Sequence, residues 1–156
     1  MGRALHDTIA ASAPVGTTGE KHTPIIRQGI SKKHAPILIV DDDPDACTIL
    51  RLFLTAEGFE VITAQSVPAA LSCMRDHLPS LIITDYNMPE ATGLDLCRDV
   101  RSHPCTWGIP IILHTGKDLS HTDELLYDKV FEKPTDLHRL SYAVRQMLAA
   151  HSTSAH

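Results

Sequence analysis

The residues of this sequence best suited to chemistry are a few acids, one hydroxyl and one lysine, each directly following a short apolar run. They are Asp41, Asp42, Asp43, Asp85, Thr115 and Lys133. Carboxylates brought close together repel one another unless they are paired, and a hard divalent cation such as Mg²⁺ takes oxygen ligands of this kind. The lysine would add a fixed positive charge and the threonine a hydroxyl donor. Such a site could stabilise a phosphoryl group during its transfer.

The elements that must position these residues follow from the hydrophobic pattern after residue 36. Short apolar runs predict five strands, at residues 37–40, 59–64, 81–83, 109–114 and 130–132. Apolar residues at helical spacing predict helices after the first, second, third and fifth strands, the last of them over residues 134–150, whereas residues 119–128 are a weak helix candidate at best. This alternation predicts a doubly wound α/β fold, a parallel sheet with helices on both faces. Reactive residues of such sheets lie beyond the carboxyl ends of the strands.

Composition excludes several classes of protein. The chain has 156 residues, 43% of them hydrophobic, with a formal net charge of -5. That charge leaves no basic surplus to neutralise nucleic-acid phosphates, and no apolar run reaches the roughly 20 residues that cross a bilayer. The four cysteines are scattered without a C-x-x-C pair, which favours reduced thiols and a cytoplasmic location. We therefore expect neither a nucleic-acid partner nor a membrane partner.

The apolar runs and the residues after them carry a family resemblance. Residues 37–43, residues 81–89 with Gly93, residues 111–115 and the tripeptide at 132–134 resemble the receiver domain of two-component response regulators, over roughly residues 36–149. The resemblance implies a flavodoxin-like sheet with strand order 2-1-3-4-5. Residues 1–34 contain several glycines, threonines and serines with little periodicity, which predicts a flexible N-terminal arm. The receiver domain would then occupy residues 35–150, with a C-terminal tail at 151–156.

The resemblance also implies a role for each acidic residue. Asp85 would be the phosphoacceptor, whose carboxylate attacks a phosphohistidine donor and forms an acyl phosphate. Asp42 would bind Mg²⁺ directly beside Asp85, and Asp41 would bind it through a water. The backbone carbonyl of Asn87 would be a further metal ligand. Asp43 stands apart, since it is the member of the set best explained as a helix cap.

Lys133 and Thr115 complete the implied site. Lys133 would pair with the phosphoryl oxygens, and the Thr115 hydroxyl would bond to them once Asp85 is modified. The preceding residue, His114, should point away from the site on an alternating strand and pack under the helices. These roles imply a sensor histidine kinase or a histidine phosphotransfer protein as the phosphodonor, and an unidentified protein as the downstream target.

Two features depart from the family pattern. Val130 stands where relatives commonly carry Tyr or Phe, and a valine cannot make the inward movement of an aromatic ring that accompanies the shift of the threonine. The switch formed by Thr115 and residue 130 is therefore open to question. The interval between Thr115 and Lys133 is also short and contains poor helix formers. We expect the fourth helix of the fold to be short or missing, or replaced by a mobile loop.

Three functions remain open from the sequence. The first is a phosphorylation-dependent receiver that signals by protein contact and is not itself an enzyme. The second is a pseudo-receiver, a scaffold that keeps the fold and has lost switching, as Val130 would allow. The third is a small phosphatase with an aspartate nucleophile, suggested by the spacing of Asp41 and Asp43, although the chain is short for that fold and leaves Asp85 without a role.

Overall fold

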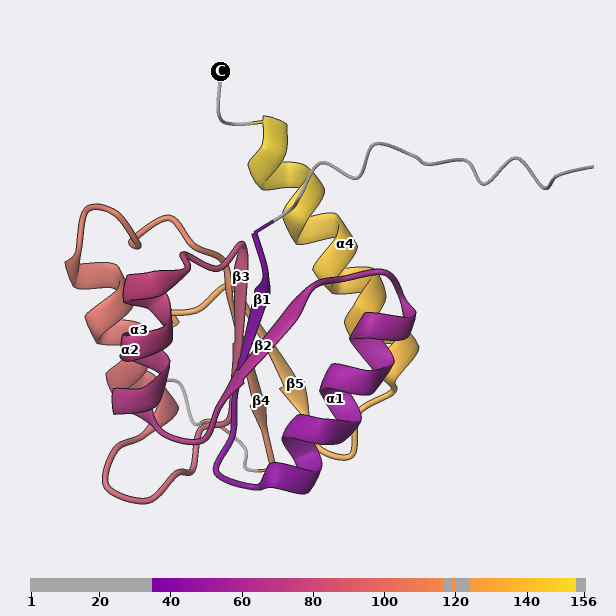
Figure 1. Ribbon diagram of the computed structural model, residues 1–156, viewed down its shortest axis with the longest axis horizontal. Coiled ribbons are helices and arrows are strands. Elements are labelled where there is room, and N and C mark those ends of the chain that lie inside the picture. Colours follow the sequence, from indigo (N-terminus) through magenta and orange to yellow (C-terminus); the bar gives the residue numbers. More distant parts are fainter. Residues whose placement is uncertain (1–34, 117–118, 120–123, 154–156) are drawn as a thin grey trace, which may run out of the picture. The chain divides into compact units, whose positions relative to one another are not determined.

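The computed structural model describes residues 35–116, 119 and 124–153. The predicted N-terminal arm and the last three residues of the predicted tail lie outside these ranges. Strands and helices alternate along the described chain, except that the last two strands follow one another with no helix assigned between them among the described residues (Figure 1). They are β1 (Ile37–Val40), α1 (Pro44–Ala56), β2 (Val61–Ala64), α2 (Val67–Asp76), β3 (Leu81–Thr84), α3 (Gly93–Ser102), β4 (Ile111–Thr115), β5 (Lys129–Glu132) and α4 (Leu137–Thr153).

The five strands form one parallel sheet in the order β2-β1-β3-β4-β5. Both the doubly wound fold and the strand order implied by the family resemblance are thereby confirmed. The central strands are covered on both sides, and no residue of β1 is more than 1% exposed. Continuous apolar runs are typical of parallel strands in this position, because neither face meets water.

Helices cover both faces of the sheet and form two separate cores. Alternate strand residues point to opposite faces, so Leu38 and Val40 join one cluster with the buried side chains of α2 and α3. Ile37 and Ile39 join the other cluster, with the buried side chains of α1 and α4. Figure 1 shows these two helix pairs on opposite sides of the strands.

The helices next to the predicted site begin at side-chain caps. Asp43 is the N-cap of α1, and its carboxylate accepts the backbone N–H of Asp45 at 2.9 Å. Thr92 and Asp95 form a capping box at the start of α3, each side chain accepting the backbone N–H of the other residue. Because these caps fix where each helix starts, they also fix the short loops that leave β1 and β3.

Several element bounds differ from the sequence prediction. β2 starts at Val61 rather than residue 59, and β4 extends one residue further, so that Thr115 is its last residue. The last helix starts at Leu137, because Asp136 caps it by accepting the backbone N–H of His138 at 2.9 Å. It continues to Thr153, three residues into the predicted tail.

The connection between β4 and β5 lacks helix in the part the structure describes. Residues 116, 119 and 124–128 are turns, bends or irregular chain, in agreement with the prediction that the fourth helix of the family fold is short or missing. With four helices assigned among the described residues, the numbering passes directly from α3 to the terminal helix α4. None of these helices is long and apolar enough to cross a membrane.

Candidate functional site

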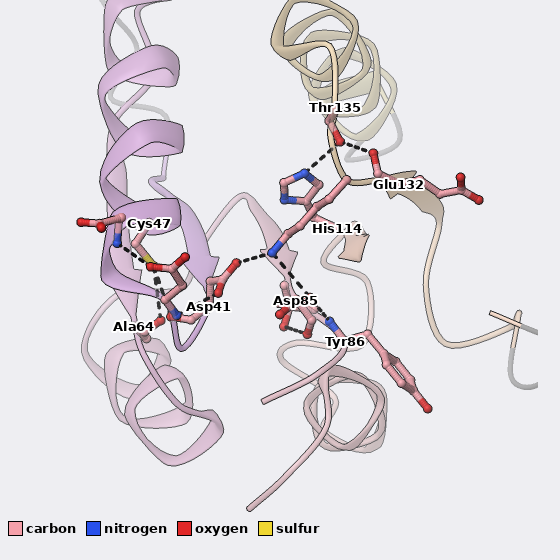
Figure 2. Close-up of polar contacts among 12 residues, drawn as sticks. Asp41, Cys47, Ala64, Asp85, Tyr86, His114, Glu132 and Thr135 are labelled. Atoms are coloured by element: carbon pink, nitrogen blue, oxygen red, sulfur yellow. Dashed lines mark hydrogen bonds and ion pairs between the residues drawn. The ribbon is translucent and has the colours of Figure 1, made fainter. Parts of the chain in front are cut away.

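Three of the predicted acids meet where β1 and β3 end. The two strands are neighbours, and the Asp85 N–H donates to the Val40 carbonyl at 2.8 Å, which places Asp85 beside the residues that follow β1. Asp41, Asp42 and Asp85 each have a carboxylate oxygen within 4.8 Å of those of the other two. Figure 2 shows Asp41 and Asp85 converging from their separate strands. The sheet therefore produces the predicted acidic cluster.

Lys133 reaches this cluster from the end of β5. Its ammonium Nζ lies 2.8 Å from Asp41 Oδ2 and 3.7 Å from Asp85 Oδ1. Its backbone N–H donates to the Thr115 carbonyl at 2.8 Å, and its peptide bond to Pro134 is cis. The lysine thus contacts two carboxylates while its own backbone is tied to the end of β4.

Burial sets the electrostatics of the two inner acids. Asp41 is 2% exposed and Asp85 is 9% exposed, whereas Asp42 is open to solvent. Burial raises the pKa of Asp85, the Lys133 ammonium opposes that change, and the Asp41 carboxylate adds to it. Burial disfavours the charged form of Lys133, yet its hydrogen bond to Asp41 and the surrounding carboxylates leave the pKa of Lys133 raised. The lysine is therefore a firmly held positive charge.

The donor set of the cluster suits a hard divalent cation. Its candidate ligand atoms are carboxylate oxygens, and exposed Asp42 leaves one side of the cluster open for water ligands. Mg²⁺ is bound by few carboxylates and keeps several waters. Asn87, a further predicted ligand, is exposed in the loop after β3, and its backbone N–H donates to the Asp85 carboxylate. The three carboxylates are therefore a candidate metal-binding cluster.

Thr115 and Asp43 differ in their relation to this cluster. Thr115 is fully buried at the end of β4, where its carbonyl accepts the Lys133 N–H. The carboxylate of Asp43 is engaged as the cap of α1, as predicted for this member of the set. The structure thus offers no support for the phosphatase alternative, which would need Asp43 as its acid.

Gly93 has a role in the site that its sequence position did not reveal. A Cβ on this residue would lie 2.2 Å from the Asp85 carbonyl oxygen, and its N–H donates to the Tyr86 carbonyl at 2.9 Å. Only a residue without a side chain allows the start of α3 to approach the backbone of Asp85 and Tyr86 this closely. A glycine immediately after a capping threonine was the available sequence signal.

Val130 lies apart from the acidic cluster. It occupies the edge strand β5, pairs in register with Leu113 and is 39% exposed. The position three residues before Lys133 therefore carries an exposed aliphatic side chain, not an aromatic ring.

Comparison with known proteins assigns the chain to a family. A family model described as the response regulator receiver domain matches residues 37–145. Response regulator PleD of Caulobacter vibrioides is 40% identical over 84 residues, covering 54% of this chain and 18% of that protein. The phosphate regulon transcriptional regulatory protein PhoB of Rhizobium meliloti is 38% identical over 81 residues, covering 52% of this chain and 36% of that protein. The chain belongs to the response regulator receiver family.

Solved structures agree with this assignment. A response regulator receiver domain protein from Clostridium thermocellum superposes with a TM-score of 0.67 at 25% identity, covering 76% of this chain and 98% of that one. The signal receiver domain of a histidine kinase from Syntrophus aciditrophicus gives a TM-score of 0.66 at 29% identity, covering 74% and 91%. By contrast, the chain spans well under half the length of the curated relatives PleD and PhoB.

Proposed function

We propose that this chain is a phosphorylation-dependent signalling receiver in which Asp85 accepts a phosphoryl group from a histidine kinase or a histidine phosphotransfer protein. The observation that carries the proposal is the convergence of Asp41, Asp42 and Asp85 within 4.8 Å, with Lys133 Nζ 3.7 Å from Asp85. Membership of the receiver family supports the same function.

Asp85 is suited to be the acceptor because it is the inner carboxylate that Lys133 does not hold in a short hydrogen bond. One Asp85 oxygen attacks the phosphorus of a phosphohistidine, an O–P bond forms, and the N–P bond breaks with its electron pair returning to the imidazole. Lys133 remains paired with Asp41 at 2.8 Å, so its ammonium is already in position to bind the incoming phosphoryl oxygens. Thr115 would offer its hydroxyl to the same oxygens after transfer.

A Mg²⁺ ion held by Asp42 and Asp85, with Asp41 acting through water and the Asn87 carbonyl as a further ligand, would neutralise charge on the phosphoryl oxygens. The chain's own contribution is to bring three carboxylates close enough to need such a cation. The mutual repulsion of these groups makes metal binding favourable before any phosphodonor arrives.

Signalling would then pass by protein contact to a downstream protein in the cytoplasm, with no nucleic acid or membrane as partner. In this proposal residues 35–150, together with the end of α4 up to Thr153, form the receiver unit, preceded by an arm at 1–34. The chain acts as a substrate of its kinase rather than as an enzyme with a turnover of its own.

Mass spectrometry after treatment with acetyl phosphate and Mg²⁺ tests the proposal. We expect a single phosphoryl adduct that maps to Asp85, requires Mg²⁺, and disappears in Asp85→Asn. Asp99→Asn is the matched control, because Asp99 is exposed on α3 and remote from the cluster in sequence. An unmodified parent protein, or an adduct that persists in Asp85→Asn, would contradict the assignment.

A pseudo-receiver scaffold is the second candidate, favoured by the exposed Val130 and by the lack of helix among the described residues between β4 and β5. Hydrogen exchange with and without beryllofluoride, a phosphoryl mimic, separates the two functions. A switching receiver should gain protection at the ends of β3, β4 and β5, whereas a pure scaffold should exchange identically in both conditions.

A further inference from the structure

His114 is a buried polar residue that the proposed chemistry does not use. It precedes Thr115 on β4 and is 7% exposed. The packed histidine predicted from the sequence is confirmed by this burial. Because side chains alternate along a strand, His114 points to the same face of the sheet as Ile112, the face covered by α1 and α4. Lys133, two residues after Phe131 of β5, starts on that face as well. His114 therefore lies on the same side of the sheet as the stem of Lys133, and the prediction that it points away from the site is wrong.

The ring of His114 is tied to the short turn that carries Lys133. Its Nε2 lies 2.9 Å from Thr135 Oγ1, and that hydroxyl lies 2.6 Å from the Glu132 carbonyl oxygen. Figure 2 shows the chain of contacts from His114 through Thr135 to Glu132. The bond from Thr135 to Glu132 closes a turn over residues 132–135, and the bond between His114 and Thr135 links this turn to β4.

The two hydrogen bonds of the Thr135 hydroxyl show which group donates between His114 and Thr135. A carbonyl can only accept, so the single hydroxyl proton of Thr135 is donated to Glu132, and His114 must donate from Nε2–H. Nδ1 has no hydrogen-bond partner among the described residues. Burial, together with the nearby Lys133 ammonium, lowers the pKa of His114 to about 4, against an opposing effect of Asp41. The imidazole is therefore neutral when Lys133 is charged.

A buried acceptor without a partner costs stability, so a simple apolar side chain would pack this position at lower cost. What the imidazole supplies is a rigid donor aimed at Thr135. Lys133 is then held from two sides, by its backbone bond to the Thr115 carbonyl at 2.8 Å and by the His114 to Thr135 contact two residues further on.

We propose that His114 is a positioning residue for Lys133, acting through Thr135 to hold the 132–135 turn so that the ammonium stays between Asp41 and Asp85. This inference rests on the proposed function, because Lys133 matters there as the group that binds the phosphoryl oxygens. It also gives β4 a second link to β5, from the residue directly before Thr115.

Two pairs of matched variants test the role. His114→Phe keeps a ring and removes the donor, whereas His114→Gln keeps an Nε2 donor. Thr135→Val removes only the hydroxyl, whereas Thr135→Ser keeps it. We expect the Phe and Val variants to be phosphorylated by acetyl phosphate about tenfold more slowly, as displacement of a positioned group predicts. The Gln and Ser variants should stay within about threefold of the parent, and the Phe/Val double variant should be no slower than either single one.

A second readout does not need phosphorylation. The ¹⁵N resonance of the Lys133 ammonium, in the metal-free protein, should shift in His114→Phe and Thr135→Val and return in His114→Gln and Thr135→Ser. Parental rates and an unmoved resonance in the Phe and Val variants would overturn the proposal, and so would Gln and Ser variants that behave like them. If the parent is not phosphorylated at Asp85, the proposed function fails, yet the Lys133 resonance still decides the role of His114. Should His114→Phe not fold, the Thr135 pair gives the same decision.

Discussion

The carboxyl ends of β1 and β3 and the outer edge of the sheet at β5 are built differently. Asp41 and Asp85 are nearly buried, follow strands with almost no exposed surface, and are tied to neighbouring backbone. On β5, by contrast, Lys129, Val130 and Glu132 are all exposed, and Phe131 is half-buried. The first region is rigidly placed by two cores, whereas the second contributes to the site only through Lys133 at its end.

The proposed phosphoryl chemistry and the transmission of the signal to a partner therefore depend on different parts of the molecule. Asp85, the proposed acceptor, and its acidic neighbours depend on β1, β3 and the start of α3, which carry residues that resemble the receiver family. The departures, Val130 and the short connection, fall on the β5 side. We infer that phosphoryl acceptance can be retained here while the route by which the modified site reaches a partner differs from that of relatives with an aromatic residue at position 130.

The largest expected effect is that of Gly93→Ala in the rigid region. The new Cβ would lie 2.2 Å from the Asp85 carbonyl oxygen, which is backbone and cannot rotate away. Moving α3 or the acceptor loop should lower the free energy of unfolding by about 3 kcal/mol and slow phosphorylation of Asp85. Chemical denaturation measures the first effect, and mass spectrometry of the phosphoryl adduct measures the second.

Gly108→Ala is the matched control, because nothing lies within 4 Å of a Cβ at that position. Its free energy of unfolding should stay within about 0.5 kcal/mol of the parent. If both alanine variants were equally stable, the close approach of α3 to Asp85 would have to be wrong.

Asp85→Asn should stabilise the metal-free protein at neutral pH. Burial raises the pKa of Asp85, so the native state binds this proton more tightly than the unfolded chain does. The stability associated with the protonated group is therefore complete below the ordinary carboxyl pKa and is lost as the pH rises through the raised value. Asparagine removes that loss because it carries no charge.

Urea denaturation in the presence of a chelator, at neutral pH and at about pH 4, checks this sign. The advantage of Asp85→Asn over the parent should shrink toward the lower pH. An advantage that grew on acidification would mean that the environment of Asp85 favours its charged form, which would contradict the buried acceptor described above.

Asp128→Ala tests the connection before β5. The Asp128 carboxylate accepts the buried Ile111 N–H at 2.7 Å and pairs with Arg101 at 3.0 Å. Because the ion pair is partly exposed, the loss should come mainly from the backbone hydrogen bond and amount to about 1 kcal/mol. Asp128→Asn keeps an acceptor and should lose less. Phosphorylation of Asp85 should be unchanged in both, and a large fall in its rate would show that the two regions are coupled.

Much of the fold and the acidic cluster could be predicted from the sequence because both depend on short-range patterns. Apolar runs predict parallel strands buried on both faces, and the carboxyl ends of such strands converge. Asp41, Asp42, Asp85 and Lys133 therefore meet as expected. The cap role of Asp43 was equally local, since it depends only on the residues at the start of α1.

What the sequence did not reveal depends on contacts between distant residues. The tight fit of Gly93 against Asp85 requires knowing how α3 packs. The bond between His114 and Thr135 joins residues that no periodicity relates, and alternation alone suggested only that His114 would face away from the site.

The start of α4 was also missed, for a local reason. The apolar pattern indicated a start at residue 134, but the Asp136 side chain caps the helix and places its first residue at Leu137.

Val130→Tyr has the smallest expected effect and most directly separates chemistry from readout. Val130 is 39% exposed on an edge strand, so a larger side chain can extend into solvent and should change the free energy of unfolding by no more than about 0.5 kcal/mol. Because Asp85 follows β3 and the backbone of Lys133 is hydrogen-bonded to the Thr115 carbonyl at the end of β4, the rate of phosphorylation should match the parent. If a threonine–aromatic switch can be restored, hydrogen exchange around residue 130 should respond to beryllofluoride in Val130→Tyr more than in the parent. A changed phosphorylation rate would instead show that β5 helps to shape the acceptor site, and the separation of the two regions would have to be abandoned.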